Sequence, residues 1–137
     1  MTATKSVRVL IISAADCSVR VESMSISGGL DHLQRAVATG SGEERGWVQC
    51  VEFPCYDMWM HEEGKVIGLQ QNKVATALWT QEYGDTDIIV GDVVLTGPAD
   101  LDGYSTDIPE HIVRSTAAIA QIVRLMPRVF DYTLDVH

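Results

Sequence analysis

Short runs of apolar, often β-branched residues recur along the chain and predict its strands. Branched side chains pack well on a pleated sheet, so such runs favour strands. We expect strands over residues 7–12, 19–22, 47–53, 56–60, 66–67 and 87–95. The first two should form one hairpin, and residues 56–60 and 66–67 another, with Gly64 at positive φ in the turn between them. Gly91, inside the last run, indicates a bulge or a close backbone approach.

Apolar positions at helical spacing predict three helices. Their apolar stripes are Leu30, Leu33, Ala36 and Val37; Val74, Ala75, Leu78 and Trp79; and Ile112, Val113, Thr116, Ile119, Ala120 and Val123. Asn72 is a favourable N-cap for the second helix. Residues 107–110, Asp-Ile-Pro-Glu, have the pattern of a capping box before the third helix, and Pro127 ends it. Residues 128–137 are expected to form a disordered tail.

The order of these elements predicts the fold class. Strands and helices alternate without a regular βαβ rhythm, and the strand pairs resemble hairpins. This order favours an α+β fold, with a mostly antiparallel sheet built from hairpins and about three helices packed on it. Pro54 should end its strand or mark an edge of the sheet. We expect a single domain over residues 1–137, because this length suits one hydrophobic core.

Composition and cysteine content indicate the setting of the protein. With 46% hydrophobic and 21% charged residues, the chain has the make-up of a soluble globular domain. Its apolar runs are far shorter than the roughly 20 residues of a membrane span, so we expect no membrane contact. The three cysteines, together with an N-terminus unlike a secretory leader, indicate free thiols in a reducing cytoplasm. We expect Cys50 and Cys55 to be buried.

The chain is strongly acidic, with a net charge of −9 at pH 7. Most of the excess lies after residue 40, and residues 41–90 hold nine acidic but three basic side chains. An acidic surface repels phosphate backbones, so we expect no contact with duplex DNA. Two interpretations stay open. The charge keeps the protein in solution, or it mimics a nucleic acid and occupies the basic groove of another protein.

Clusters of reactive side chains occur, but their spacing does not match catalytic or metal-binding motifs. Residues 61–63, His-Glu-Glu, lack the second histidine of a zinc-binding helix, and adjacent side chains diverge. Residues 100–107 resemble part of a calcium loop, yet prolines occupy its first and last ligand positions. Cys50 and Cys55 lack the spacing and the second pair of a zinc knuckle. We therefore predict no catalytic residues, no metal and no cofactor.

A spaced motif between residues 62 and 79 carries a resemblance to a known family. The matching residues are Glu62, Glu63, Gly64, Lys65, Gly68, Leu69, Asn72, Lys73, Ala75, Leu78 and Trp79. Together with residues 87–91 and the strand leading to loop 100–103, they resemble the domain-of-unknown-function family numbered 3846, over roughly residues 28–113. Gln70 and Gln71 depart from the pattern, since prolines are expected there. The N-terminal hairpin and the final helix are expected to lie partly outside the common core.

The resemblance implies a setting but supplies no catalytic residues. Members of that family occur in phages, plasmids and mobile regions of bacterial genomes, many of them actinobacterial. It therefore implies a small accessory protein that acts in the host cytoplasm.

Three classes of function stay open. The favoured one is a non-enzymatic protein that binds a host protein and modulates a host function such as a defence system. Its contact candidates lie in the acidic loops 41–46 and 61–65 with one tryptophan, and they are Glu43, Glu44, Trp59, Glu62 and Glu63. The second class is a binder of a nucleotide-type signal, with candidates Asn72, Lys73 and Arg114. The least favoured is a metal-dependent enzyme using Asp100, Asp102 and His111. A virion component and a homo-oligomer, paired through the edge beside Pro54, also stay open.

Overall fold

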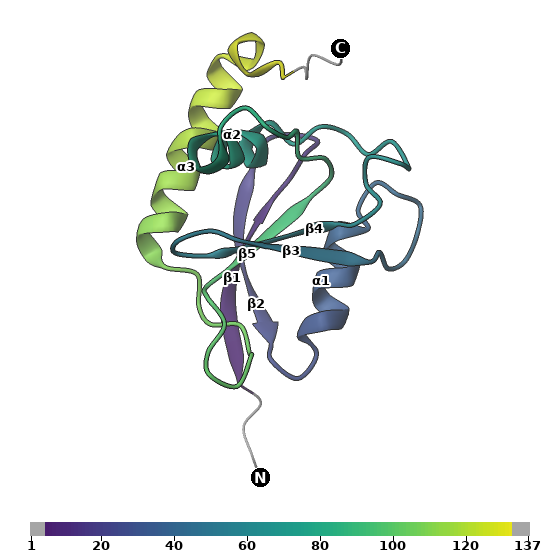
Figure 1. The fold of residues 1–137 in the computed structure, drawn as a ribbon, viewed down its shortest axis with the longest axis vertical. Helices are drawn as coiled ribbons and strands as arrows, with labels where there is room; N and C mark the ends of the chain where they lie inside the picture. The colour runs from purple at the N-terminus through teal and green to yellow at the C-terminus, as the bar shows by residue number, and fades with distance from the viewer. Residues whose placement is uncertain (1–4, 133–137) are drawn as a thin grey trace.

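The structure, a computed structural model, describes residues 5–132 and contains an antiparallel sheet of five strands. The strands are β1 (Ser6–Ile12), β2 (Val19–Ser25), β3 (Val48–Glu52), β4 (Asp57–His61) and β5 (Val93–Thr96). Their order across the sheet is β2-β1-β5-β4-β3 (Figure 1). Two hairpins, β1–β2 and β3–β4, lie on either side of β5, which pairs with both β1 and β4. The predicted α+β class with a mostly antiparallel sheet is confirmed.

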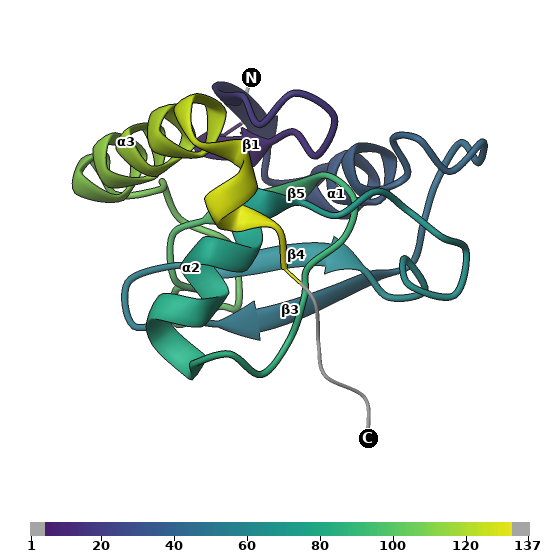
Figure 2. The ribbon, with the colours of Figure 1, turned by 90° about the horizontal axis from the view of Figure 1, so that it is seen from above.

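Helices cover both faces of this sheet. They are α1 (Gly29–Val37), α2 (Lys73–Tyr83) and α3 (Glu110–Leu125), followed by the 3₁₀ helix η1 (Pro127–Phe130). Figure 2 shows α1 on one side of the sheet and α2 and α3 on the other. Along β1, Val9 and Ile11 belong to the α1 side, whereas Leu10 and Ile12 belong to the α2–α3 side. Burial of both faces explains why β1 is a continuous apolar run.

The predicted hairpin between residues 56–60 and 66–67 is wrong. The β4 strand pairs with β3 on one side and β5 on the other, so no free edge remains for a second partner. Residues 62–68 instead form successive turns, and the side chain of Val66 is 87% exposed. Gly64 is not among the glycines with positive φ; Gly68, with a φ of 75°, takes that conformation.

The run 87–95 also differs from the prediction, because the strand is limited to Val93–Thr96. Val90 contributes only an isolated bridge to Gln71. Gly91 has a φ of 75°, and a Cβ built on it would lie 2.8 Å from Leu69 Cδ1. The group that comes close to Gly91 is the side chain of Leu69, whereas the prediction was a bulge or a close approach of backbone.

The predicted capping box before α3 does not form. Asp107 Oδ1 accepts a hydrogen bond from Arg8 N at 2.8 Å, so this carboxylate binds the β1 backbone. Pro109 occupies the N-cap position of α3 without a side-chain hydrogen bond. The Asp107 carboxylate binds the β1 backbone instead of capping α3, because the strand N–H of Arg8 would otherwise have no hydrogen-bond partner.

The predicted disordered tail begins too early. Residues 127–130 form η1, and Lys73 Nζ donates to the Pro127 carbonyl at 3.1 Å and pairs with Asp131 at 2.7 Å. Phe130 packs against the α2–α3 core. Residues 133–137 lie outside the described residues. Within residues 5–132, no helix is long and apolar enough to cross a membrane.

Asn72 joins three separate parts of the fold. It is the N-cap of α2, as predicted, and its Oδ1 accepts from Ala75 N at 3.0 Å. Its Nδ2 donates to the carbonyl of Ile12 at 3.0 Å and to that of Gly91 at 2.9 Å. The side chain is fully buried, so these three bonds satisfy groups that water does not reach.

We predict that Asn72→Ala lowers the free energy of unfolding by about 3 kcal/mol. The change removes an N-cap, which costs about 1 kcal/mol. It also leaves two buried carbonyls without donors, at a cost of about 1–3 kcal/mol. Urea unfolding followed by circular dichroism measures the loss. Gln71→Ala, at the exposed neighbour, is the control and should change stability by less than about 0.5 kcal/mol. Equal stability of the two variants would contradict this role of Asn72.

Candidate functional site

The structure brings the two acidic loops together at one end of the β3–β4 hairpin. The Glu62 N–H donates to the carbonyl of Trp47 at 2.8 Å, which joins loop 61–65 to the start of β3. Gly46 lies against the His61 imidazole so closely that a Cβ there would be 2.6 Å from Nε2. The Glu63 N–H in turn donates to His61 Nδ1 at 3.0 Å. The two loops proposed from the sequence therefore form one continuous surface.

Of the four glutamates proposed from the sequence as contact residues, one is neutralised by ion pairs with described residues and three are not. Glu44 pairs with Arg35 at 3.1 Å and with Arg45 at 3.6 Å, so its charge is balanced. The same two arginines bind Asp31, and their hydrogen bonds, that of Arg45 first, lower the pKa of its carboxyl. Within residues 5–132, no ion pair involves Glu43, Glu62 or Glu63, and all three are exposed.

The exposed indole at this surface belongs to Trp47. Its side chain is 67% exposed, and its backbone carbonyl holds Glu62. Trp59, the candidate from the sequence, is only half-exposed, and its Nε1–H donates to Thr96 Oγ1 at 2.9 Å. Sequence reasoning missed Trp47 because exposure of an indole depends on what packs against it. The available signal was its position directly after the polar loop 40–46.

The residues proposed for nucleotide binding do not form a common site. Asn72 uses its side chain to bind backbone groups inside the fold. Lys73 lines a pocket of about 290 Å³ with Asp16, Cys17 and other residues, but Asn72 and Arg114 do not line it. Arg114 is exposed on α3. The three candidates therefore serve separate parts of the molecule.

The residues proposed for a metal-dependent enzyme are also not assembled. Asp100 closes its own turn, because its Oδ1 accepts from the backbone N–H of Asp102 and of Tyr104. His111 lies exposed on α3. Among the described residues, no three His, Cys, Asp or Glu side chains form a group that could hold a metal ion.

The prediction that Cys50 and Cys55 are buried is wrong. Cys50 and Cys55 are exposed, and Cys17 is half-exposed. The two thiols are exposed because β3 is an edge strand and Cys55 lies in the turn beyond it. Partial desolvation, followed by the carboxylates of Asp57 and Glu52, raises the pKa of the Cys50 thiol to about 12. This thiol therefore stays protonated at neutral pH.

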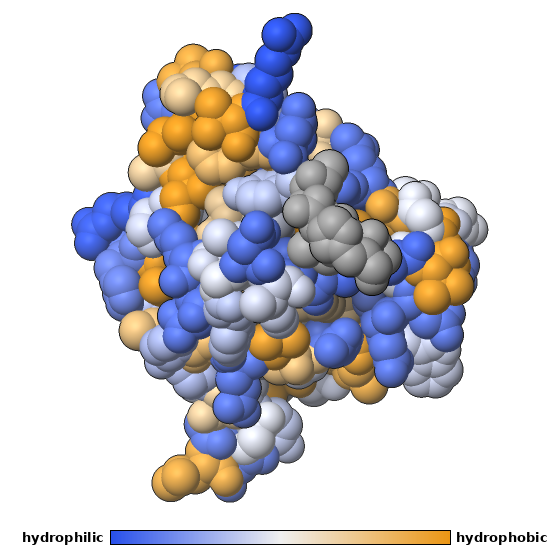
Figure 3. Space-filling model, turned by 45° about the horizontal axis from the view of Figure 1, so that its top comes forward, coloured by the Kyte–Doolittle hydropathy of each residue, from blue (hydrophilic) through white to orange (hydrophobic). Residues whose placement is uncertain are grey.

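A second exposed surface is apolar and lies at the end of α3. Ile122, Leu125, Met126 and Val129 are between 48% and 73% exposed. Figure 3 shows apolar side chains gathered over this end of the molecule. Pro54 follows β3, which is an edge strand as predicted. Homo-oligomerisation through the edge beside Pro54 stays a prediction.

The fold and the surface together define a small α+β protein with an acidic, tryptophan-bearing end. The model of the family described as domain of unknown function DUF3846 matches residues 7–121, and the chain belongs to this family. The match confirms the resemblance and reaches beyond residues 28–113, since it takes in the β1–β2 hairpin and most of α3. Comparisons with curated proteins and with solved structures found no match.

Asp57 is a buried carboxylate at the far end of the same hairpin. It is 8% exposed and lies directly across from Glu52 on β3. Burial, and then the charge of Glu52, raise the pKa of Asp57 above its ordinary value. The folded protein therefore binds this proton more tightly than the unfolded chain does. Stability should be greatest with Asp57 protonated and should fall as the pH rises through its folded pKa.

We predict that Asp57→Asn stabilises the protein at pH 7.5, because the neutral amide avoids burying a charge. The gain should shrink as the pH is lowered toward about 3.5, where the native carboxyl is protonated as well. Thermal melts of both proteins at several pH values measure the difference. Asp102→Asn, at an exposed position, is the control and should show no such pH-dependent gain. Destabilisation by Asp57→Asn at pH 7.5 would contradict the argument.

Proposed function

We propose that this chain is a non-enzymatic binding protein of a phage or plasmid type, which binds a basic surface of a host protein in the cytoplasm. Binding would modulate a host function such as a defence system. The contact lies on the Trp47 surface, defined as residues 43–47 with residues 62–63. The observation that carries the proposal is an exposed indole beside exposed carboxylates that form no ion pair with any described residue.

The chemistry of this surface supports a protein partner. Tryptophan is enriched among the residues that dominate binding energy, because its large flat ring buries much apolar area. Glu43, Glu62 and Glu63 form no ion pair in the described part of the chain, and their carboxylates favour a partner with arginine or lysine at the rim. Charges of this kind raise the rate of association and select against acidic partners.

The surface is also held in place before binding. The Gly46 N–H donates to the carbonyl of Gln34 at 2.9 Å, which fixes loop 41–46 on α1. The bond from Glu62 to Trp47 fixes the second loop on the first. Ion pairs among Asp31, Glu44, Arg35 and Arg45 add to the attachment. A preformed contact surface loses less conformational entropy on binding than a mobile loop does.

We predict that Trp47→Ala weakens binding of the partner by about 30-fold, the effect of losing an anchor residue. The double change Glu62→Lys with Glu63→Lys should also weaken binding, and by more at low salt, where charges act over longer distances. Proteins captured from a bacterial host lysate by the native chain are quantified by mass spectrometry. The captured partner is then purified, and its affinity for each variant is measured at two salt concentrations.

Two control variants test whether any lost ring or any reversed charge on the protein surface would weaken binding in the same way. Tyr104→Ala removes an exposed aromatic ring elsewhere, and Asp85→Lys with Asp102→Lys reverses two exposed charges outside the Trp47 surface. Both should retain the partner. Capture that is equal for all variants, or lost equally in the controls, would rule out the Trp47 surface as the contact.

A further inference from the structure

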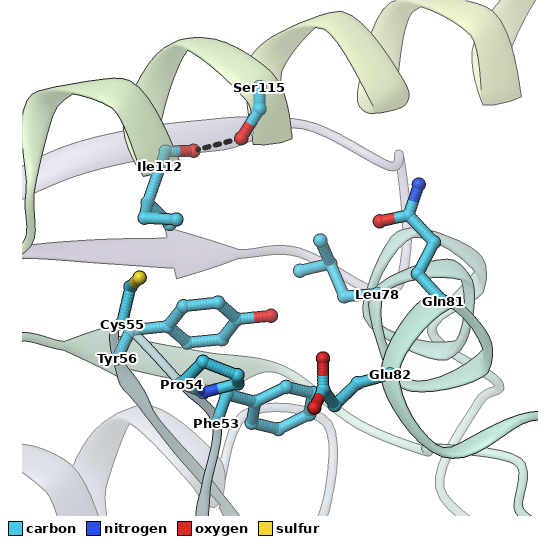
Figure 4. A pocket seen from close by; sticks show the side chains of 9 residues that line it. All are labelled: Phe53, Pro54, Cys55, Tyr56, Leu78, Gln81, Glu82, Ile112 and Ser115. Atoms are coloured by element: carbon cyan, nitrogen blue, oxygen red, sulfur yellow. Dashed lines mark hydrogen bonds between the residues drawn. The ribbon is translucent and has the colours of Figure 1, made fainter.

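A pocket opens at the other end of the β3–β4 hairpin, away from the Trp47 surface. The register pairs Val48 with His61 at one end of the hairpin and Glu52 with Asp57 at the other, so the two sites are separated by the length of the strands. The pocket has a volume of about 200 Å³. It lies between the β3–β4 turn, α2 and α3 (Figure 4), and its lining is Phe53, Pro54, Cys55, Tyr56, Leu78, Gln81, Glu82, Ile112 and Ser115.

The floor of the pocket is rigid and aromatic. The rings of Phe53 and Tyr56 stack with centroids 4.7 Å apart and planes 11° from parallel. Trp79 and Tyr83 pack edge-on against Phe53 from α2. The Tyr83 hydroxyl also donates to the carbonyl of Glu52, which ties α2 to the end of β3. The pocket is thus shaped by packed rings and needs no rearrangement to exist.

The Tyr56 hydroxyl is an unpaired polar group directed into this space. The residue is only 7% exposed, and no described residue hydrogen-bonds its hydroxyl (Figure 4). In Figure 4 the hydroxyl points toward the gap between Leu78 and Glu82. Burial, and then the charge of Glu82, raise the pKa of Tyr56, so the phenol is neutral. Its oxygen can accept a hydrogen bond from a ligand, while its proton remains available to donate.

The charge of the pocket selects the ligand class. Glu82 is the sole charged residue in the lining. An anion such as a nucleotide would be repelled, whereas an ammonium group can donate to both the Glu82 carboxylate and the Tyr56 oxygen. Beyond these polar atoms, Leu78 and Ile112 offer apolar surface. A cavity of about 150 Å³ is large enough for benzene, so this pocket has room for one ring with a short side chain.

We propose that this pocket binds a small cationic amine with a single aromatic or similarly sized apolar ring. The ammonium group pairs with Glu82 and Tyr56, and the ring lies on Leu78 and Ile112. The site is independent of the Trp47 surface, because it uses different residues at the opposite end of the hairpin.

Three probes of similar size and different charge test this assignment. They are 2-phenylethylamine, 2-phenylethanol and 3-phenylpropanoate, each titrated into the ¹⁵N-labelled full chain while amide shifts are recorded. We expect saturable shifts at residues 53–56, 78–82 and 112–115, with a millimolar dissociation constant typical of so small a ligand. The amine should bind at least fivefold tighter than the alcohol, and the carboxylate most weakly.

Matched variants assign the preference to named groups. Glu82→Gln should reduce the advantage of the amine over the alcohol at least threefold, while Glu110→Gln, on α3 outside the lining, should leave it unchanged. Tyr56→Phe should weaken binding of the amine and of the alcohol, because both lose a hydrogen bond to the hydroxyl. Ser115→Trp, at an exposed position of the rim, should block all three probes with the thermal melt unchanged.

The titrations can contradict the proposed pocket in three ways. Equal binding of amine and carboxylate, or shifts located elsewhere on the chain, would overturn it. Absence of any saturable shift with the native protein would also overturn it. A loss of partner capture by the Trp47 variants with probe binding intact would leave the pocket assignment standing, and the reverse result would leave the Trp47 surface standing.

Discussion

The buried carboxamide of Asn72 is the interaction on which the arrangement of this fold depends. It binds the end of β1 through Ile12, the turn before β5 through Gly91, and the first turn of α2 through Ala75. Thr76 continues the same network, since its Oγ1 donates to the Asn72 carbonyl and accepts from Ile89 N. A carboxamide supplies both donors and an acceptor from one compact group, which neither a carboxylate nor a hydroxyl can do in this geometry. The positions of α2 and β5 are therefore set together.

The position of β5 determines where the two proposed contact regions lie. The strand has four residues, yet it pairs with both hairpins and is buried throughout. It thereby fixes the β3–β4 hairpin, whose two ends carry the acidic Trp47 surface and the aromatic pocket. The first end is polar and held by backbone hydrogen bonds, whereas the second is apolar and held by ring packing. One hairpin thus presents two chemically different surfaces.

Local signals predicted those parts of the fold that depend on neighbouring residues. The β1–β2 hairpin, the apolar stripes of α2 and α3 and the Asn72 cap follow from spacing within a few residues of each other. In α1, Leu33 and Val37 are buried as predicted, whereas Leu30 is 60% exposed. The order of the strands in the sheet could not be predicted from such local spacing, because it depends on which strand edges, far apart in the sequence, remain free for pairing. Val66 and Ile67 have strand-like side chains but no edge to join. Asp107 has the residue type of a cap but meets the Arg8 backbone, 99 residues away.

In the candidate site, too, the sequence indicates the local features, whereas the contacts between distant residues become visible only in the structure. The acidic loops were visible in the sequence, but their contact through Glu62 and Trp47 was not. Among the three tryptophans, only the polar loop that precedes Trp47 indicated which indole is exposed, since each of the three has an apolar neighbour. The pocket could not be foreseen either, since Tyr56, Glu82 and Ile112 come from three elements that meet only in the folded chain.

The insertion of β5 between two hairpins has a consequence during synthesis on the ribosome. The hairpins are made of residues 6–25 and 48–61, so both leave the ribosome before residues 93–96. Until then, the edges of β1 and β4 that β5 later covers are open, and they carry apolar side chains. Open edges of this kind are prone to pairing with other chains. The nascent protein is thus most vulnerable to aggregation just before its shortest strand emerges.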